Sequence, residues 1–187
     1  MQLQAGDKAP EFVVTDIDGN SQVPTGSGRS PVLLTFFRHA GCPMCNLRTC
    51  ELILAKSDLD RYGVKVVGVF ESSEKNIRRD VGRQDPPFPI IPDRKRRLYK
   101  LYGVSPSWVG FISIFVVNPR RVYEAIVKNR FIPKFGEVTP MMPAEFLIAP
   151  DGKIKLAYYG RDIGDHLPLP DLFNALNQLS SDGESAD

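Results

Sequence analysis

Phe36-Phe37-Arg38-His39-Ala40-Gly41-Cys42-Pro43-Met44-Cys45 joins a predicted buried strand to a predicted helix. The apolar run 32–37 has the length and residue types of a buried strand. A helical pattern follows, with Leu47, Cys50 and Leu54 at the spacing i, i+3 and i+7. The N-terminus of a helix stabilises a thiolate through its unpaired N–H groups and its dipole. A Cys-x-x-Cys at this junction therefore predicts a redox-active pair, Cys42 and Cys45, close enough to form a disulfide.

Composition restricts the class of protein. The 187 residues suffice for one domain, and the net charge of +2, from 24 basic and 22 acidic residues, argues against a nucleic-acid partner. Three cysteines are too few for a secreted disulfide scaffold, and the N-terminus does not resemble a signal peptide. The longest apolar stretch, 108–117, is too short to span a bilayer. We expect a cytoplasmic protein with no membrane partner, and we interpret the basic run 94–97 as a solvated helix face.

The order of elements predicts an α/β fold. The first expected elements are a hairpin over 12–23, a strand over 32–37 and a helix from Cys45 to about Leu59. A strand over 64–70 and a short helix capped by Ser72 or Ser73 follow. A basic helix over 94–102 comes next, with Leu98, Leu101 and Tyr102 facing the core. A second hairpin, 145–149 with 154–159, and a helix over 171–179 end the ordered part. Residues 180–187 are expected to be a disordered tail.

Residues 105–140 are the least readable part of the chain. We interpret them as an insertion with one or two helices, one of them over 121–130. Its aromatic and aliphatic residues are too dense for a free loop. We expect the insertion either to cover part of the active-site face or to form a subunit contact.

Several segments resemble the thioredoxin-like superfamily in its peroxiredoxin form. The resemblance rests on Gly6–Phe12, Phe88–Asp93, Phe146–Ile154 and Gly160–Leu167, and on the Cys-Pro-x-Cys motif itself. The chain resembles peroxiredoxin-like proteins of the alkyl hydroperoxide reductase/thiol-specific antioxidant (AhpC/TSA) group. This implies a thioredoxin-like fold with a central mixed sheet flanked by helices and a peroxiredoxin-type N-terminal extension. Residues 1–179 would form a single domain interrupted by the insertion.

The resemblance leaves two assignments of the cysteine pair open. In a thioredoxin-like frame, Cys42 is the more exposed thiol and the nucleophile, and Cys45 resolves the intermediate. In the peroxiredoxin frame, Cys45 stands at the peroxidatic position, Cys42 where the family keeps a Thr, and Cys50 where one subgroup has its resolving cysteine. The segment Met142-Pro143-Ala144 stands where the family keeps an Arg, and Pro143 resembles the cis-proline of thioredoxins.

Other side chains near the motif allow a functional and a structural interpretation. His39 either lowers a thiol pKa or is a solvated turn residue. Arg38 and Arg48 either replace the missing Arg or are surface charges. Cys50 shares a face with Leu47 and Leu54, which favours core packing. His166 lies after the last strand with Asp162 and Asp165, so we expect it to make local capping and turn bonds. A zinc site with His39 and the cysteines would lack a second paired motif.

These observations predict an antioxidant oxidoreductase that reduces hydroperoxides through Cys42 and Cys45, using electrons from a thioredoxin- or glutaredoxin-like thiol donor. Pro143, His39, Arg38 and Cys50 are accessory candidates, and neither a cofactor nor a metal is expected. Two alternatives stay open: a protein disulfide oxidoreductase, and a non-catalytic module that binds a partner through residues 108–135. The oligomeric state is left open, with a homodimer as one alternative.

Overall fold

The computed structural model describes residues 1–23, 30–131 and 139–184, with side chains through 181. A five-stranded mixed sheet lies at its centre, in the strand order β5-β4-β3-β6-β7. The strands are β3 (Val32–Phe36), β4 (Lys65–Phe70), β5 (Ile90–Pro92), β6 (Ala144–Ile148) and β7 (Ile154–Tyr159). β3 pairs in parallel with β4 and antiparallel with β6, so the strand that leads into the cysteines is central. The predicted α/β, thioredoxin-like fold is confirmed.

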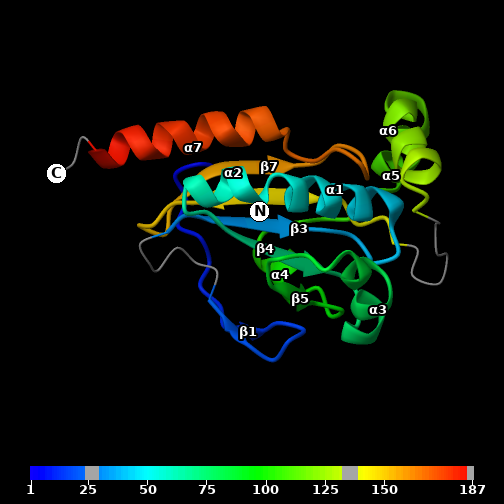
Figure 1. Cartoon of the computed structure of the whole chain (residues 1–187), viewed down its shortest axis with the longest axis horizontal. Helices are drawn as coiled ribbons and strands as arrows, with labels where there is room; N and C mark the ends of the chain where they lie inside the picture. Colours follow the sequence, from blue (N-terminus) through cyan, green and yellow to red (C-terminus); the bar gives the residue numbers. More distant parts are fainter. Residues whose placement is uncertain (24–29, 132–138, 185–187) are drawn as a thin grey trace.

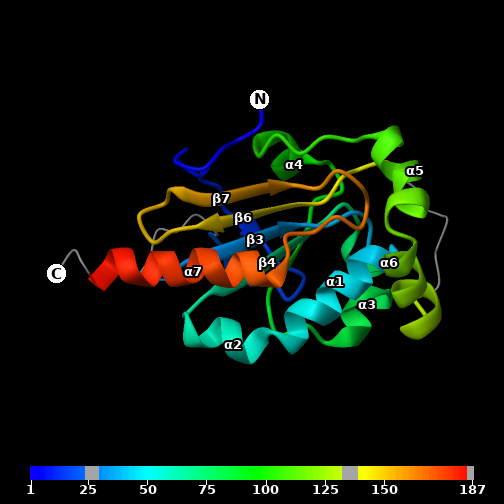
Figure 2. The same cartoon turned by 90° about the horizontal axis from the view of Figure 1, so that it is seen from above.

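Helices cover both faces of this sheet (Figures 1 and 2). They are α1 (Pro43–Leu54), α2 (Lys56–Arg61), α3 (Glu74–Arg79), the 3₁₀ turn η1 (Val81–Gln84), α4 (Arg97–Leu101), α5 (Trp108–Val117), α6 (Pro119–Tyr123), the π-helical turn η2 (Glu124–Lys128) and α7 (Leu169–Glu184). A small hairpin, β1 (Val14–Thr15) with β2 (Ser21–Gln22), precedes the sheet.

The alternation of side chains along the strands divides the core into two clusters. Leu33 and Phe37 point to the face covered by α1, α3 and α7, whereas Leu34 and Phe36 point to the face covered by α4. Because side chains alternate along a strand, one fully buried strand supplies both cores. On the first face, the rings of Phe37 and Phe70 are stacked 4.4 Å apart.

The structure corrects three details of the predicted helices. The helix after the cysteines breaks at Ala55, and its Leu54 is exposed rather than packed on the core. Leu101 of α4 is also exposed, and the neighbouring Tyr99 is buried instead, with its hydroxyl donating to the Phe37 and Val69 carbonyl oxygens. Finally, α7 continues to Glu184, into the segment predicted to be a disordered tail.

The insertion contains α5, α6 and η2 and lies beside the N-terminus of α1 in both views (Figures 1 and 2). Gly110 lets α5 approach the rest of the molecule closely, because a Cβ there would lie 2.6 Å from the Arg161 carbonyl oxygen. The helix predicted over 121–130 begins at Pro119 and ends at Lys128, and it changes without a break from α6 to the π-helical η2 at Glu124. Residues 132–138, which include Phe135, lie outside the described residues. Within the described part of the chain, no helix is long and apolar enough to cross a membrane.

Candidate active site

Both cysteines lie at the N-terminus of α1, immediately after the central strand. Cys42 is the N-cap residue, Pro43 occupies the first turn, and Cys45 follows within the same turn. Proline suits this position because its missing N–H would have no partner there. Both thiols are free, and the residues are 1% and 0% exposed. The thioredoxin-like frame leads us to expect Cys42 to be the more exposed thiol, whereas the structure buries both cysteines almost equally.

Arg38 contacts both sulfur atoms. Its guanidinium Nη1 lies 3.1 Å from Cys42 Sγ, and its backbone N–H donates to Cys45 Sγ at 3.3 Å. The guanidinium also donates to the Thr139 carbonyl oxygen and lies 5.0 Å from the centre of the Phe111 ring. These contacts hold a cation beside the thiols in a site that water does not reach. The interpretation of Arg38 as a surface charge is wrong, because the side chain is buried.

The two thiols differ in acidity. Burial raises the pKa of the Cys42 thiol, but the hydrogen bond from Cys45 and the charge of Arg38 outweigh burial and bring the pKa well below its usual range. Burial also raises the pKa of Cys45, and the neighbouring Cys42 raises it further, well above its usual range. The pair therefore favours a Cys42 thiolate hydrogen-bonded by a neutral Cys45 thiol.

Side-chain hydrogen bonds fix the turn that carries the cysteines. Asn46 donates from Nδ2 to the carbonyl oxygens of Ala40 and Cys42, at 2.7 and 2.9 Å. Gln84 Nε2 in turn donates to Asn46 Oδ1 at 2.9 Å. His39 is buried in this turn rather than solvated, and its charge contributes to lowering the Cys42 pKa. The rigid turn keeps Cys42 and Cys45 side by side.

Comparison with known proteins is consistent with this geometry. Residues 5–157 match the AhpC/TSA family. The chain belongs to the AhpC/TSA family. Peroxiredoxin Bcp of Escherichia coli (strain K12) is 28% identical over 110 residues, which is 58% of this chain and 70% of that protein. Peroxidoxin BcpB from Mycobacterium tuberculosis has a crystal structure similar in fold, with a TM-score of 0.67 at 15% identity over 96% of this chain and 98% of that one.

A second solved structure with a similar fold is that of a mutant of Peroxiredoxin 6 of Arenicola marina. Its TM-score is 0.69 at 18% identity, and the match covers 95% of this chain and 74% of that one. These structures confirm the fold, and the family match with the Bcp relative identifies the chain as a peroxiredoxin-like thiol peroxidase.

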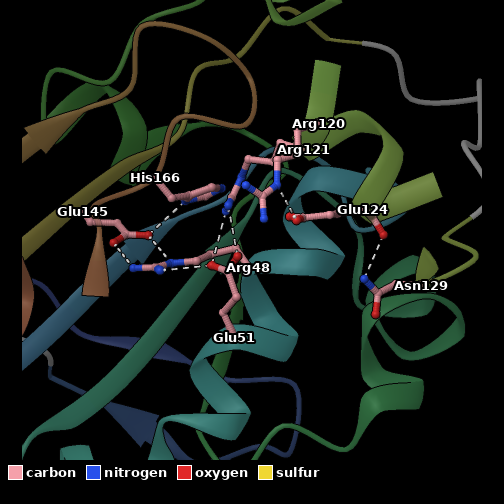
Figure 3. A network of polar contacts seen from close by, with 8 residues as sticks. All are labelled: Arg48, Glu51, Arg120, Arg121, Glu124, Asn129, Glu145 and His166. Atoms are coloured by element: carbon pink, nitrogen blue, oxygen red, sulfur yellow. Dashed lines mark hydrogen bonds and ion pairs between the residues drawn. The ribbon is translucent and has the colours of Figure 1, made fainter. Parts of the chain in front are cut away.

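This AhpC/TSA protein has a second buried polar cluster that the sequence analysis missed (Figure 3). Arg48 of α1 makes two hydrogen bonds to Glu145 of β6, at 2.6 and 2.9 Å, and His166 Nδ1 lies 2.9 Å from Glu145 Oε1. Burial alone would raise the pKa of Glu145, but Arg48 and His166 lower it to about 2. The ionised carboxylate can only accept, so His166 Nδ1 carries the proton. The signal in the sequence was a glutamate inside an otherwise apolar strand.

The same cluster ties the insertion to helix α1. Glu51 of α1 accepts from Arg48 at 3.2 Å and pairs with Arg121 of α6 at 3.0 Å (Figure 3). Arg48 is therefore occupied by carboxylates, and the interpretation in which it supplies the family's Arg to the thiols is not supported. Arg38 alone of the two candidates contacts sulfur.

The remaining candidates lie elsewhere or differ from expectation. Pro143 is buried. The peptide bond before it is trans, because no cis peptide bond occurs among the described residues, so the cis-proline expectation is wrong. Cys50 is half-buried and belongs to neither core cluster, which contradicts its assignment to the core. His166 contacts Glu145 rather than turn residues only. Across the described ranges, no group of three His, Cys, Asp or Glu could hold a metal.

Proposed function

We propose that the Cys42 thiolate reduces hydroperoxides and that Cys45 resolves the product by forming a disulfide with Cys42. The observation that carries the proposal is the Arg38 guanidinium at 3.1 Å from Cys42 Sγ. A thiolate is the reactive form of cysteine, and a buried cation stabilises it more strongly than a solvated one does. Cys45 accepts the backbone N–H of Arg38, and its raised pKa keeps the thiol protonated.

The first step oxidises Cys42 by two electrons. Its sulfur attacks the terminal oxygen of the hydroperoxide, an S–O bond forms, the O–O bond breaks, and the leaving alkoxide takes a proton to become an alcohol. The Arg38 N–H groups beside the sulfur can donate to the charge that develops on the oxygens. In this site Arg38, two residues after β3, takes the role of the family's later Arg.

The second step closes the disulfide. The Cys45 thiol attacks the sulfenic acid of Cys42, an S–S bond forms, and the hydroxyl leaves as water with the thiol proton. Cys42 and Cys45 lie in one helical turn at the N-cap of α1, so the disulfide forms between neighbouring side chains of the same turn. An external dithiol, of thioredoxin- or glutaredoxin-like chemistry, then returns two electrons and two protons. We place this cycle in the cytoplasm, where such donors are kept reduced.

A protein disulfide oxidoreductase is the second candidate, and the Cys-x-x-Cys at a helix N-cap favours it. Exchange with a protein disulfide requires in-line approach of a bulky substrate to the attacking sulfur. Cys42 is buried against Arg38, and Phe111 lies over the Arg38 guanidinium, so a small hydroperoxide fits the site better. This difference in access makes peroxide reduction the preferred function.

Trapping of sulfenic acid tests the assignment of the two cysteines. We expect hydrogen peroxide to produce a dimedone adduct in Cys45→Ser, on Cys42, and none in Cys42→Ser. Cys50→Ser is the matched control and should form the Cys42–Cys45 disulfide as the parent does. An adduct only in Cys42→Ser would assign attack to Cys45, as in the peroxiredoxin frame. If neither variant forms an adduct while disulfide exchange is intact, the protein is a disulfide oxidoreductase rather than a peroxidase.

A further inference from the structure

The outward face of α5 is entirely apolar. Five residues form one stripe at the spacing i, i+1, i+4, i+7 and i+8, and they are 58–82% exposed: Trp108, Val109, Ile112, Phe115 and Val116. A helix that faces water normally carries polar or charged residues at such positions. Val117, Tyr123 and Val127 extend the exposed apolar surface into the following turns. A continuous apolar face of this kind marks an interaction site.

The orientation of α5 is fixed from its inner side. Gly110 and Ile114 are buried, and a Cβ at Gly110 would lie 2.7 Å from Met142 Sδ. Rotating the helix to hide its outer stripe would therefore expose Ile114 and break this close packing. The stripe faces outward because the inner side is already occupied.

The segment that carries the stripe is also basic. Residues 105–131 contain Arg120, Arg121, Lys128 and Arg130 but one acidic residue, Glu124, so their charge is +4 − 1 = +3. Since the whole chain carries +2, the remaining residues sum to −1. Arg120 pairs with Glu124 and Arg121 with Glu51, whereas Lys128 and Arg130 are exposed. The segment that carries the stripe is thus net basic, and Lys128 and Arg130 are exposed in it.

We propose that α5 lies on the surface of an anionic lipid bilayer. An apolar helix face with an aromatic residue at one end and basic residues beside it inserts shallowly at the headgroup boundary and gains from anionic lipids. A second copy docking on α5 through a two-fold axis would place two net-basic segments against each other, each with exposed Lys128 and Arg130, which opposes self-association. The proposal departs from the expectation of no membrane partner, which rested on the absence of a stretch long enough to span a bilayer; a ten-residue helix cannot span one but can lie on its surface.

This docking would bring the thiol site to hydroperoxides carried by the lipids, a consequence that rests on the proposed function. Phe111, on the same helix, lies against Arg38, and Arg38 contacts Cys42. Oxidised acyl chains carry a polar –OOH group, which favours the headgroup boundary over the hydrocarbon core. The reaction is the two-electron step already given, with the lipid hydroperoxide reduced to a lipid alcohol.

Sedimentation with vesicles tests the docking surface separately from catalysis. The Cys42→Ser protein should bind vesicles of mixed phosphatidylglycerol and phosphatidylcholine, and bind pure phosphatidylcholine less. Adding Val109→Gln and Val116→Gln should weaken binding by about tenfold, from the apolar area lost. Val13→Gln with Leu54→Gln is the matched control, because these residues are comparably exposed but lie elsewhere, and it should bind as the parent does.

Three results would overturn the docking: no vesicle binding by the parent, equal binding by the two double variants, or a dimer in sedimentation velocity that Val109→Gln with Val116→Gln converts to monomer. In the otherwise unmodified enzyme, that double variant should reduce vesicle-borne lipid hydroperoxide about tenfold more slowly but hydrogen peroxide at the parental rate. Vesicle binding without reduction of either peroxide would instead contradict the proposed function and leave the docking surface in place.

Discussion

At the scale of single residues, the site depends on one buried cation. Arg38 is held by the Thr139 carbonyl oxygen and by the Phe111 ring, both far away in the sequence, and it delivers its charge to Cys42. Cys42 and Cys45 share one helix terminus, so the terminus alone cannot separate their acidities. The hydrogen bond between the two thiols separates them, because it lowers the pKa of Cys42 and raises that of Cys45, and the nearby Arg38 charge lowers the Cys42 pKa further.

Replacing Arg38 with Met should raise the pKa of Cys42, because burial remains while the compensating charge is lost. We expect the midpoint of the pH profile of iodoacetamide alkylation, measured in Cys45→Ser/Cys50→Ser protein, to move up by about 1–2 pH units. Near neutral pH the alkylation rate should fall correspondingly. Arg61→Met, at an exposed arginine of α2, is the control and should leave the midpoint in place. An unchanged midpoint in Arg38→Met would contradict the assigned role.

The sequence predicted the cysteine pair at a helix start, because that signal is local. It did not decide between the functional and surface interpretations of Arg38, His39 and Arg48, since burial of a charge depends on distant partners. Phe111 and Thr139 cover Arg38, and Glu145 neutralises Arg48. The burial of both cysteines was not predictable for the same reason: Arg38, which lies against Cys42, is itself held by Phe111 and Thr139 from distant parts of the chain.

At the scale of elements, helix α1 shows how a buried ion pair changes a helix face. The apolar spacing of Leu47, Cys50 and Leu54 predicted the inner side, yet Leu54 is exposed. The residues buried below the first turn include Arg48, Thr49 and Leu52. A hydrophobic pattern cannot detect a face that contains an arginine, because the arginine is buried only with its partner on β6.

Glu145→Gln should destabilise the protein by about 3–5 kcal/mol at neutral pH, because it leaves Arg48 buried without its main counter-charge. The pKa of Glu145 is lowered when the protein folds, so its contribution is present above the unfolded-state pKa and is lost as the pH falls towards 2. Urea unfolding from neutral to acid pH should therefore show the difference between parent and variant shrinking.

The control for this prediction is Glu11→Gln, which removes an exposed carboxylate that pairs with Lys8. Exposed pairs contribute about 0–1 kcal/mol, so its unfolding curve should follow that of the parent at every pH. If Glu145→Gln and Glu11→Gln had the same small effect, the Arg48–Glu145–His166 cluster would not stabilise the fold.

At the scale of the whole molecule, the sheet was predictable and the insertion was not. The strands predicted over 32–37, 64–70, 145–149 and 154–159 correspond to β3, β4, β6 and β7, and the order of elements along the chain indicated the α/β fold. Within residues 105–131, the outer and inner sides of α5 are both apolar, so no periodicity reports its orientation. Only the packing at Gly110 and Ile114 decides which side faces outward.

The insertion is attached to the core by few buried side chains, which predicts how the thiol becomes accessible. In α5, α6 and η2 the buried residues are Gly110, Ile114 and Ala125, and one ion pair, Arg121 with Glu51, joins α6 to α1. The strand β3 is buried throughout. Segments with little buried surface open locally at a lower free energy than the global unfolding of the domain. We therefore expect peroxide to reach Cys42 through opening of the insertion.

Alkylation of Cys42 in native protein at increasing urea concentration measures this opening. Its free energy should depend weakly on urea, because a local opening exposes little surface, whereas amide exchange in β3 should show the full dependence of global unfolding. Glu51→Gln, which weakens the tie to Arg121, should accelerate alkylation severalfold without changing the β3 amides, and Glu74→Gln, at an exposed pair in α3, should change neither. Equal urea dependence for Cys42 and β3 would mean that the thiol is reached only by unfolding the sheet, and the insertion would then be a fixed cover.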